Sequence, residues 1–489
     1  MALSNSNRAV GEHCLSGQGL QLGQEREQVL AHLHQLVADV WAGFDHARDA
    51  EPAISDSVTN LLASPMPAIG GDPIEMLGLA AEVLNQSTAQ ARPRYLAYIG
   101  SSGLEIGAVA DFLASSYDIN MATHARAATA LEEQTAAWLA DFIGCKGFKG
   151  LFTSGGTMSN LTALSAARHR ADPTVREHGL GKPLAVYCSA EAHYSNQRAI
   201  ETLGLGRRSI RSIPVDSHHR MDPAALEASI LEDLQNGITP MAIIATAGTT
   251  LTGAVDDLEA IARIAKTHGV WLHVDGAYGA PAAGSSAAGH LFKGLAKADS
   301  VTIDAHKWLF VPKACSIVLV KDLGSLASTF SHNEAYMPHV GSVLNPVDVT
   351  LEYSRPLRAL KLWLGFLTHG ANAFAAAIDG NLALAKRVYE TARNADDFNV
   401  MAHAPQLSIV PVQYYPAEAA AGGITKSDFN RQLCDAIVAD GRVFLSPGQI
   451  DGETWLRPCF TNFRTSESDV GEFFKVVREL GQALATKLS

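Results

Sequence analysis

Between about residues 149 and 320, short runs rich in Val and Ile alternate with helical segments of ten or more residues. This alternation constrains the fold most, because strands separated by helices of this length pair in parallel and are covered on both faces. The strands are expected at 149–152, 184–188, 241–247, 270–275, 299–303 and 314–320, with helices at 157–169, 222–235 and 256–268. We therefore expect an α/β fold with a mostly parallel central sheet flanked by helices.

The rest of the chain predicts smaller additions to this domain. Residues 22–48 carry apolar side chains at helical spacing, whereas the first stretch is polar and rich in Gly and Ser. Beyond residue 355 a long helical region, 357–396, precedes expected strands at 407–413, 442–445 and 454–459. The expected organisation is a disordered tail at 1–20, an N-terminal helical arm at 21–100, a large domain at 101–355, and C-terminal helices with a small α+β domain at 356–489.

Composition narrows the class of protein. The 489 residues are 47% hydrophobic and 18% charged, as in an ordinary globular enzyme, and the net charge of -12 argues against nucleic acid as a partner. No apolar run approaches the ~18 residues that span a bilayer, and no apolar segment near the start resembles a signal peptide. Six scattered cysteines without a CxxC pair favour a reducing cytoplasm, and without an HExxH motif we expect no metal.

A lysine after one of the expected strands is the first candidate catalytic residue. Asp304-Ala305-His306-Lys307-Trp308 follows the apolar run 300–303. Most lysines are surface charges, and Lys307 alone could be one. A lysine at the end of a buried strand is also suited to attack an aldehyde and form an imine.

Two further motifs lie upstream in the same domain. Thr153-Ser154-Gly155-Gly156-Thr157 opens an expected helix, where free amides and a hydroxyl suit a phosphate, although such a run can also be a simple helix cap. Asp275 ends the apolar run 270–274, the end at which open α/β sheets place ligands, although it could merely cap the next loop.

Phosphate cradle, carboxylate and lysine are the three groups that pyridoxal phosphate requires from a protein. The carboxylate of Asp275 would keep the pyridine nitrogen protonated, and Lys307 would form the imine. His193, in Ala192-His193-Tyr194-Ser195, could stack on the ring and orient the substrate carboxylate, or could be an ordinary core histidine. Thr246 to Thr250 add hydroxyls after another strand.

In this order, the motifs Thr-Ser-Gly-Gly-Thr, Ala-His-Tyr-Ser, Thr-Ala-Gly-Thr-Thr, His-Val-Asp-Gly-Ala-Tyr and Asp-Ala-His-Lys-Trp resemble those of the group II pyridoxal-phosphate decarboxylases. The likeness runs from about residue 25 to the end. It implies a fold-type I homodimer with active sites at the subunit interface. It also implies roles for individual residues: Lys307 as the imine lysine, Asp275 on the ring nitrogen, His193 and Ala277 on the two ring faces, and Gly156, Thr157, Thr250 and His306 at the phosphate.

One position departs from the animal aromatic enzymes of that family. Asp304 stands where they have Asn, and a carboxylate near a phosphate is electrostatically unfavourable.

The resemblance also bears on the reaction. Tyr336, in Asn333-Glu334-Ala335-Tyr336, matches the loop tyrosine that protonates the α-carbon after carbon dioxide leaves. Since this tyrosine and His193 are both present, we expect decarboxylation of an L-amino acid to its amine. An aldehyde synthase or lyase on the same fold is the first alternative, and a scaffold protein that does no catalysis is the second.

The side chain of the substrate is less constrained. Tyr98, Ile99 and Ser101 match the region where the aromatic enzymes build their substrate pocket, which favours an aromatic or other neutral side chain. Residues 118–123 faintly resemble a segment of the glutamate enzymes, so glutamate or another amino acid stays an alternative.

Overall fold

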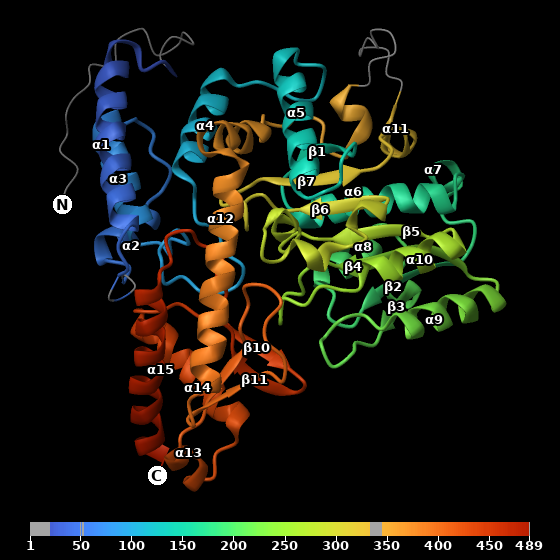
Figure 1. Ribbon diagram of the computed structural model, residues 1–489. Coiled ribbons are helices and arrows are strands. Elements are labelled where there is room, and N and C mark those ends of the chain that lie inside the picture. Colours follow the sequence, from blue (N-terminus) through green and yellow to red (C-terminus); the bar gives the residue numbers. More distant parts are fainter. Residues whose placement is uncertain (1–19, 49, 51–52, 333–344, 489) are drawn as a thin grey trace. The chain divides into compact units, whose positions relative to one another are not determined.

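The computed structural model describes residues 20–48, 50, 53–332 and 345–488, which form two compact units. The larger unit, Ala47–Ala50 with Ala89–Ser489, is built around a seven-stranded sheet of order β1-β7-β6-β5-β4-β2-β3 (Figure 1). Its strands are β1 (Lys149–Thr153), β2 (Leu184–Ser189), β3 (Ile210–Ile213), β4 (Thr239–Thr246), β5 (Trp271–Asp275), β6 (Ser300–Ile303) and β7 (Ser316–Val320). The sequence predicted all of these strands except β3.

Strand direction decides where the functional side chains meet. Strands β3, β2, β4, β5 and β6 pair in parallel, whereas β7 is antiparallel to both β6 and β1. Because β7 reverses direction between them, β1 runs the same way as β6. The predicted α/β fold with a mostly parallel sheet is confirmed, and six of the seven strands end at one common edge.

Alternating side chains pack the sheet into two separate apolar clusters. On one face Phe152, Ile243 and Val274 pack with α5 (Ala127–Phe142), α9 (Pro223–Gln235) and α10 (Leu258–His268). On the other face, Leu151, Ile244 and Trp271 pack with α6 (Gly156–Ala171), α8 (Tyr194–Thr202) and α11 (Gly324–Phe330). Successive side chains of a strand point to opposite faces of the sheet. Because helices cover both faces, both sets of side chains are apolar, and each strand is a continuous apolar run in the sequence.

The C-terminal part of this unit adds long helices and a small sheet. Helix α12 (Ala359–Arg393) is kinked at Gly370, whose φ of 75° is not helical. The second sheet has the order β10-β11-β9-β8 and is antiparallel. Its strands are β8 (Phe398–Val400), β9 (Val412–Tyr414), β10 (Pro447–Ile450) and β11 (Glu453–Leu456).

The predicted small C-terminal α+β element is therefore present, but its strand limits differ from the sequence prediction. Residues 442–445 are not a strand: Phe444 forms only an isolated bridge with Tyr95. In the expected strand 407–413, Ile409 forms only an isolated bridge with Cys459, and the continuous strand begins at Val412. These strands are short, so turns and bridges decide their ends more than apolar pattern does.

The remaining helices of the larger unit are α4 (Glu105–Tyr117), α7 (Val175–His178), α13 (Ala417–Ala421), α14 (Lys426–Asp440) and α15 (Glu467–Leu488). The smaller unit, Met1–His46 with Glu51–Thr88, contains α1 (Arg26–Phe44), α2 (Asp56–Leu62) and α3 (Pro73–Asn85). Asp72 caps α3 by accepting from the amides of Ile74 and Glu75, and Pro73 is its first residue, an ordinary helix start.

The expected tail at 1–20 lies almost wholly outside the described residues. Within the described part of the chain, none of the helices combines the length and apolar character needed to cross a bilayer.

Candidate active site

A cavity of about 690 Å³ opens at the carboxyl edge of the large sheet. Its wall includes ten of the residues that the sequence nominated, which come from six separate segments: Tyr98, Ile99, Gly156, Thr157, His193, Thr250, Asp275, Ala277, His306 and Lys307. Tyr336 lies outside the described residues. The common strand direction thus brings nearly the whole predicted set to one place.

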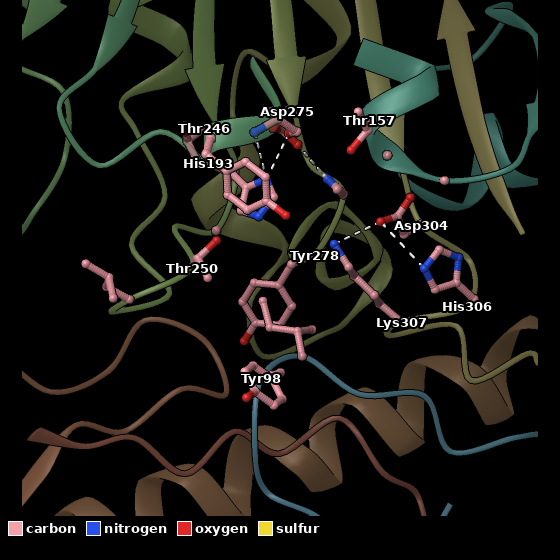
Figure 2. Close-up of a pocket in the computed structure, with 18 of the residues that line it drawn as sticks. Tyr98, Thr157, His193, Thr246, Thr250, Asp275, Tyr278, Asp304, His306 and Lys307 are labelled. Carbon is pink, nitrogen blue, oxygen red and sulfur yellow. Dashed lines mark hydrogen bonds and ion pairs between the residues drawn. The ribbon is translucent and has the colours of Figure 1, made fainter. Parts of the chain in front are cut away.

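The half-buried Lys307 forms an ion pair with the buried Asp304 inside this cavity. Its Nζ lies 2.8 Å from Oδ2 of Asp304, and Nε2 of His306 lies 3.8 Å from the same oxygen (Figure 2). Burial acts to lower the pKa of Lys307, but the attraction of the Asp304 carboxylate outweighs it and holds that pKa above its usual value. Burial lowers the pKa of His306, so its imidazole is neutral near pH 7.

Asp275 ends β5 with its carboxylate surrounded by N–H donors. Oδ2 accepts from Nδ2 of Asn160 at 2.9 Å and from Nδ2 of Asn196 at 2.7 Å. Oδ1 accepts from the backbone amide of Ala277 at 3.2 Å, which leaves it free to take a further donor from the cavity. The carboxylate is thus fixed in orientation and reaches the cavity wall.

His193 is fixed by the first turn of α8. Its Nδ1 accepts from the backbone amide of Ser195 at 3.3 Å, so His193 is the N-cap of that helix. With Nδ1 accepting, the proton of the neutral ring lies on Nε2. Burial lowers the pKa of His193 although the charge of Asp275 opposes this. The cavity therefore holds a neutral imidazole with one defined N–H.

The turn from β1 into α6 contains Gly156 and Thr157, which the sequence predicts to bind phosphate. A Cβ atom added to Gly156 would lie 3.0 Å from Oδ2 of Asp304 and 3.2 Å from Cβ of Ala277, so a larger residue would crowd this site. The first amides of α6 lack helical acceptors and point out of its N-terminus, an arrangement that favours an anion.

These residues fit pyridoxal phosphate on two further observations. The Oγ1 atom of Thr246 is buried at the cavity wall and has no hydrogen-bond partner within the described residues, as expected of a group that bonds a ligand. A lysine and a carboxylate stand at the ends of neighbouring strands, β6 and β5, as the aldehyde and ring nitrogen of that cofactor require.

Only two of the three predicted substrate-binding residues lie on the cavity wall. Tyr98 and Ile99 line the cavity, but Ser101 does not. Ser101 is buried, and its hydroxyl donates to the carbonyl of Val311 at 3.0 Å. A sequence match over 98–101 cannot tell which way each side chain turns, and here Ser101 ties two backbone segments together.

Sequence reasoning missed Arg457, which lines the cavity from the end of β11. Its guanidinium donates to the carbonyls of Thr250 at 2.7 Å and Tyr98 at 3.3 Å, and to Oγ of Ser446 at 3.0 Å. Tyr98 has a φ of 52°, a costly conformation for a residue with a Cβ. Arg457 thus holds the strained segment, and a lone arginine after an apolar strand gave no signal of this.

Three other residues were also missed. Asn160 and Asn196 follow Thr157 and His193 by three residues each, a spacing that places them on the first turns of α6 and α8. That spacing could have nominated them. Lys313 lines the cavity and hydrogen-bonds Oε1 of Gln90.

Known proteins resemble this chain over most of its length. The family model described as the pyridoxal-dependent decarboxylase conserved domain matches residues 67–414. The chain is 35% identical over 479 residues to the aromatic-L-amino-acid decarboxylase of Bacillus atrophaeus, covering 96% of this chain and 98% of that protein. It is 32% identical over 337 residues to human cysteine sulfinic acid decarboxylase, covering 67% and 68%.

A solved structure shares the fold. The crystal structure of Oryza sativa TDC with PLP and tryptamine superposes with a TM-score of 0.88 at 24% identity and covers 96% of this chain and 100% of that one. The predicted fold-type I architecture agrees with this likeness.

Replacing Asp304 by Asn should strengthen the binding of pyridoxal phosphate. The change removes a negative charge beside the phosphate cradle and lets the pKa of Lys307 fall, so more of the amine is neutral. We expect the dissociation constant to fall about tenfold, equivalent to about 1.4 kcal/mol. Tryptophan fluorescence during titration of the cofactor-free protein measures it. Asp435→Asn, an exposed change on α14, is the control; weaker binding by Asp304→Asn would contradict the expectation.

Proposed function

The chain belongs to the pyridoxal-dependent decarboxylase family, and we propose that it removes carbon dioxide from an aromatic or other neutral L-amino acid. It is a pyridoxal-phosphate-dependent amino acid decarboxylase. The observation that carries the proposal is the meeting of Lys307, Asp275 and His193 with the cradle at Gly156 around one cavity. A scaffold protein would have no use for a half-buried lysine, a fixed carboxylate and a phosphate cradle in the same place.

Each residue then has a distinct task. When bound, pyridoxal phosphate withdraws the electrons left on the α-carbon as carbon dioxide departs. Asp275 would accept a hydrogen bond from the protonated ring nitrogen, and the N-terminus of α6 would bind the phosphate. His193 would cover the ring and orient the substrate carboxylate with its Nε2–H. Lys307 would hold the cofactor between turnovers and take up a proton when the substrate amine replaces it.

The wall around Tyr98 supports a neutral substrate. Ile99, Leu251, Ala314 and Pro447 present apolar surface there, which suits an aromatic side chain. The Bacillus atrophaeus relative, which matches this chain nearly end to end, is named for aromatic amino acids. Arg457 keeps its positive charge, but most of its N–H donors are already used by backbone carbonyls and by Ser446.

A second candidate substrate is an amino acid with an acidic side chain. Lys313 is a basic side chain on the same wall, and burial lowers its pKa. An ammonium there would attract a side-chain carboxylate or sulfinate, and the human relative is named for cysteine sulfinic acid. Lys313 already bonds Gln90, which satisfies one of its three N–H donors, so we rank this candidate second.

We also propose that the enzyme is a homodimer. Val109, Phe112, Leu113 and Tyr117 are exposed on α4, with Tyr117 at 77%. Their spacing of three, one and four residues forms a single apolar stripe on one helix face. A second copy of the chain is the partner we propose for this stripe, since a large apolar surface on a globular protein usually marks an interface.

The proposed location is the cytoplasm. Five cysteines within the described residues are buried free thiols, which a reducing compartment preserves.

Substrate and reaction are tested together by measuring carbon dioxide release from each common L-amino acid and cysteine sulfinate. We expect release from an aromatic substrate and at least a 10³-fold loss of kcat in Lys307→Ala. Lys313→Met should leave this aromatic activity nearly unchanged. Release from an acidic substrate alone, lost in Lys313→Met, would favour the second candidate. Release by Lys307→Ala at the wild-type rate would refute the assignment.

Replacing Tyr336 by Phe should change the product. Without its phenolic proton donor, the α-carbon is exposed to oxygen, so we expect part of the product to become aldehyde and ammonia with consumption of oxygen. Chromatography of amine and aldehyde, with an oxygen electrode, measures the ratio. Tyr353→Phe, a tyrosine outside the cavity wall, is the control. An unchanged yield of amine would show that another group delivers the proton.

The oligomeric state should depend on the stripe on α4. We expect the wild-type mass by light scattering to be twice that of the chain, and Phe112→Glu with Tyr117→Glu to shift it towards the monomer because two charges would be buried. Exposed Leu234→Glu on α9 is the matched control. A wild-type monomer, or a dimer that tolerates the double change, would contradict the proposed interface.

A further inference from the structure

A line of buried polar side chains runs from Asp275 into the interior, away from the cavity. Trp271, His273 and Asp275 alternate along β5 and therefore share the face that packs against α6. Asn160 comes from α6, and Ser300 lies beside His273 on β6, its registered partner. Asn160, His273 and Ser300 are fully buried, and Trp271 is 4% exposed.

Four hydrogen bonds join these side chains end to end. Nε1 of Trp271 lies 2.8 Å from Oγ of Ser300, which lies 2.8 Å from Nδ1 of His273. Nε2 of His273 lies 3.0 Å from Oδ1 of Asn160, and Nδ2 of Asn160 lies 2.9 Å from Oδ2 of Asp275. We propose that His273 is a positioning residue: this relay fixes the direction of the Asn160 amide and through it the carboxylate that meets the cofactor's ring nitrogen.

The chemistry of the end groups permits one arrangement of hydrogens. The indole of Trp271 can only donate, so the oxygen of Ser300 accepts from it. At the other end the Asp275 carboxylate can only accept, so Asn160 turns its nitrogen to Asp275 and its oxygen to His273. Nδ1 of the neutral ring then accepts from the hydroxyl of Ser300. The proton of the neutral ring is then on Nε2 and is donated to Oδ1 of Asn160. The amide nitrogen of Asn160 is left facing the acceptor Asp275. A donor-only group at one end and an anion at the other therefore specify every bond between them.

The neutral state of His273 is required for this order. A protonated ring would donate from both nitrogens and would break the bond from Ser300. Burial lowers the pKa of His273 to about 4, although the charge of Asp275 opposes this. At the far end of the line the guanidinium of Arg170 lies over the ring of Trp271. The ring of His273 is therefore neutral near pH 7.

Without His273 the oxygen of the Asn160 amide loses its donor, and only the bonds from its nitrogen to Asp275 and to Oγ of Ser195 hold its orientation. If it turned over, its oxygen would face Oδ2 of Asp275, and two acceptors in contact repel each other. Asn196 would still donate to Asp275, so the carboxylate would be loosened and not lost. The inference concerns the cofactor, not the substrate side chain, and so stands apart from the choice between neutral and acidic substrates.

The test compares His273→Leu, which removes the relay, with His273→Gln, whose amide can still donate towards Asn160 and accept from Ser300. The readouts are the dissociation constant of pyridoxal phosphate, the pH titration of its absorbance on the protein, and kcat and KM separately. For His273→Leu we expect cofactor binding to weaken about tenfold. The midpoint of the absorbance titration should shift by about half a pH unit or more, and kcat should fall while KM stays unchanged. His273→Gln should restore most of each.

Val274→Ala is the matched control, because Val274 is buried on the opposite face of β5. This substitution should lower the stability of the protein without changing a residue of the relay. An absorbance titration of His273→Leu that matches the wild type, or a shift reproduced by Val274→Ala, would overturn the proposal. If His273→Leu does not fold, Ser300→Ala decides instead. It removes the donor to Nδ1 and should shift the titration in the same direction, and an unchanged titration would overturn the proposal.

Discussion

The shared direction of β1, β2, β4, β5 and β6 is the constraint on which the site depends. Each strand ends at the same edge, so the cradle at Gly156, the imidazole of His193, the carboxylate of Asp275 and the amine of Lys307 meet there although over 150 residues of chain separate the first from the last. Antiparallel β7 allows this arrangement, because it lies between β1 and β6 and is antiparallel to both, so β1 runs in the same direction as β6.

The sequence predicted the parts of this site that follow strands, and for a physical reason. A buried strand is visible as an apolar run, and the residue after it can be assigned to the sheet edge without knowing any contact. Arg457 and Lys313 were not predicted because their roles arise from tertiary contacts with residues far away in the chain. Ser101 lies outside the cavity wall for a related reason: neighbouring residues in an irregular segment point in directions that no periodicity determines.

The Asp304 carboxylate and a bound phosphate would supply negative charge to the same region of the site. In the protein alone, Asp304 balances Lys307, and the two together bury no net charge. A phosphate arriving at α6 brings negative charge to the side of Asp304, where the helix N-terminus and the neutral imidazole of His306 offer hydrogen-bonding groups. The ion pair therefore protects a reactive amine before the cofactor binds and conflicts with the phosphate after it does.

The position of Arg457 late in the chain has a consequence for the order in which parts of the site form during synthesis. The strained backbone at Tyr98 is held by an arginine about 360 residues later, which also grips the carbonyl of Thr250. A chain still being synthesised can complete the large sheet, with its lysine, carboxylate and cradle, before that arginine exists. The rim of the cavity then closes last, so an unfinished chain has the chemical groups of the enzyme without the geometry to use them.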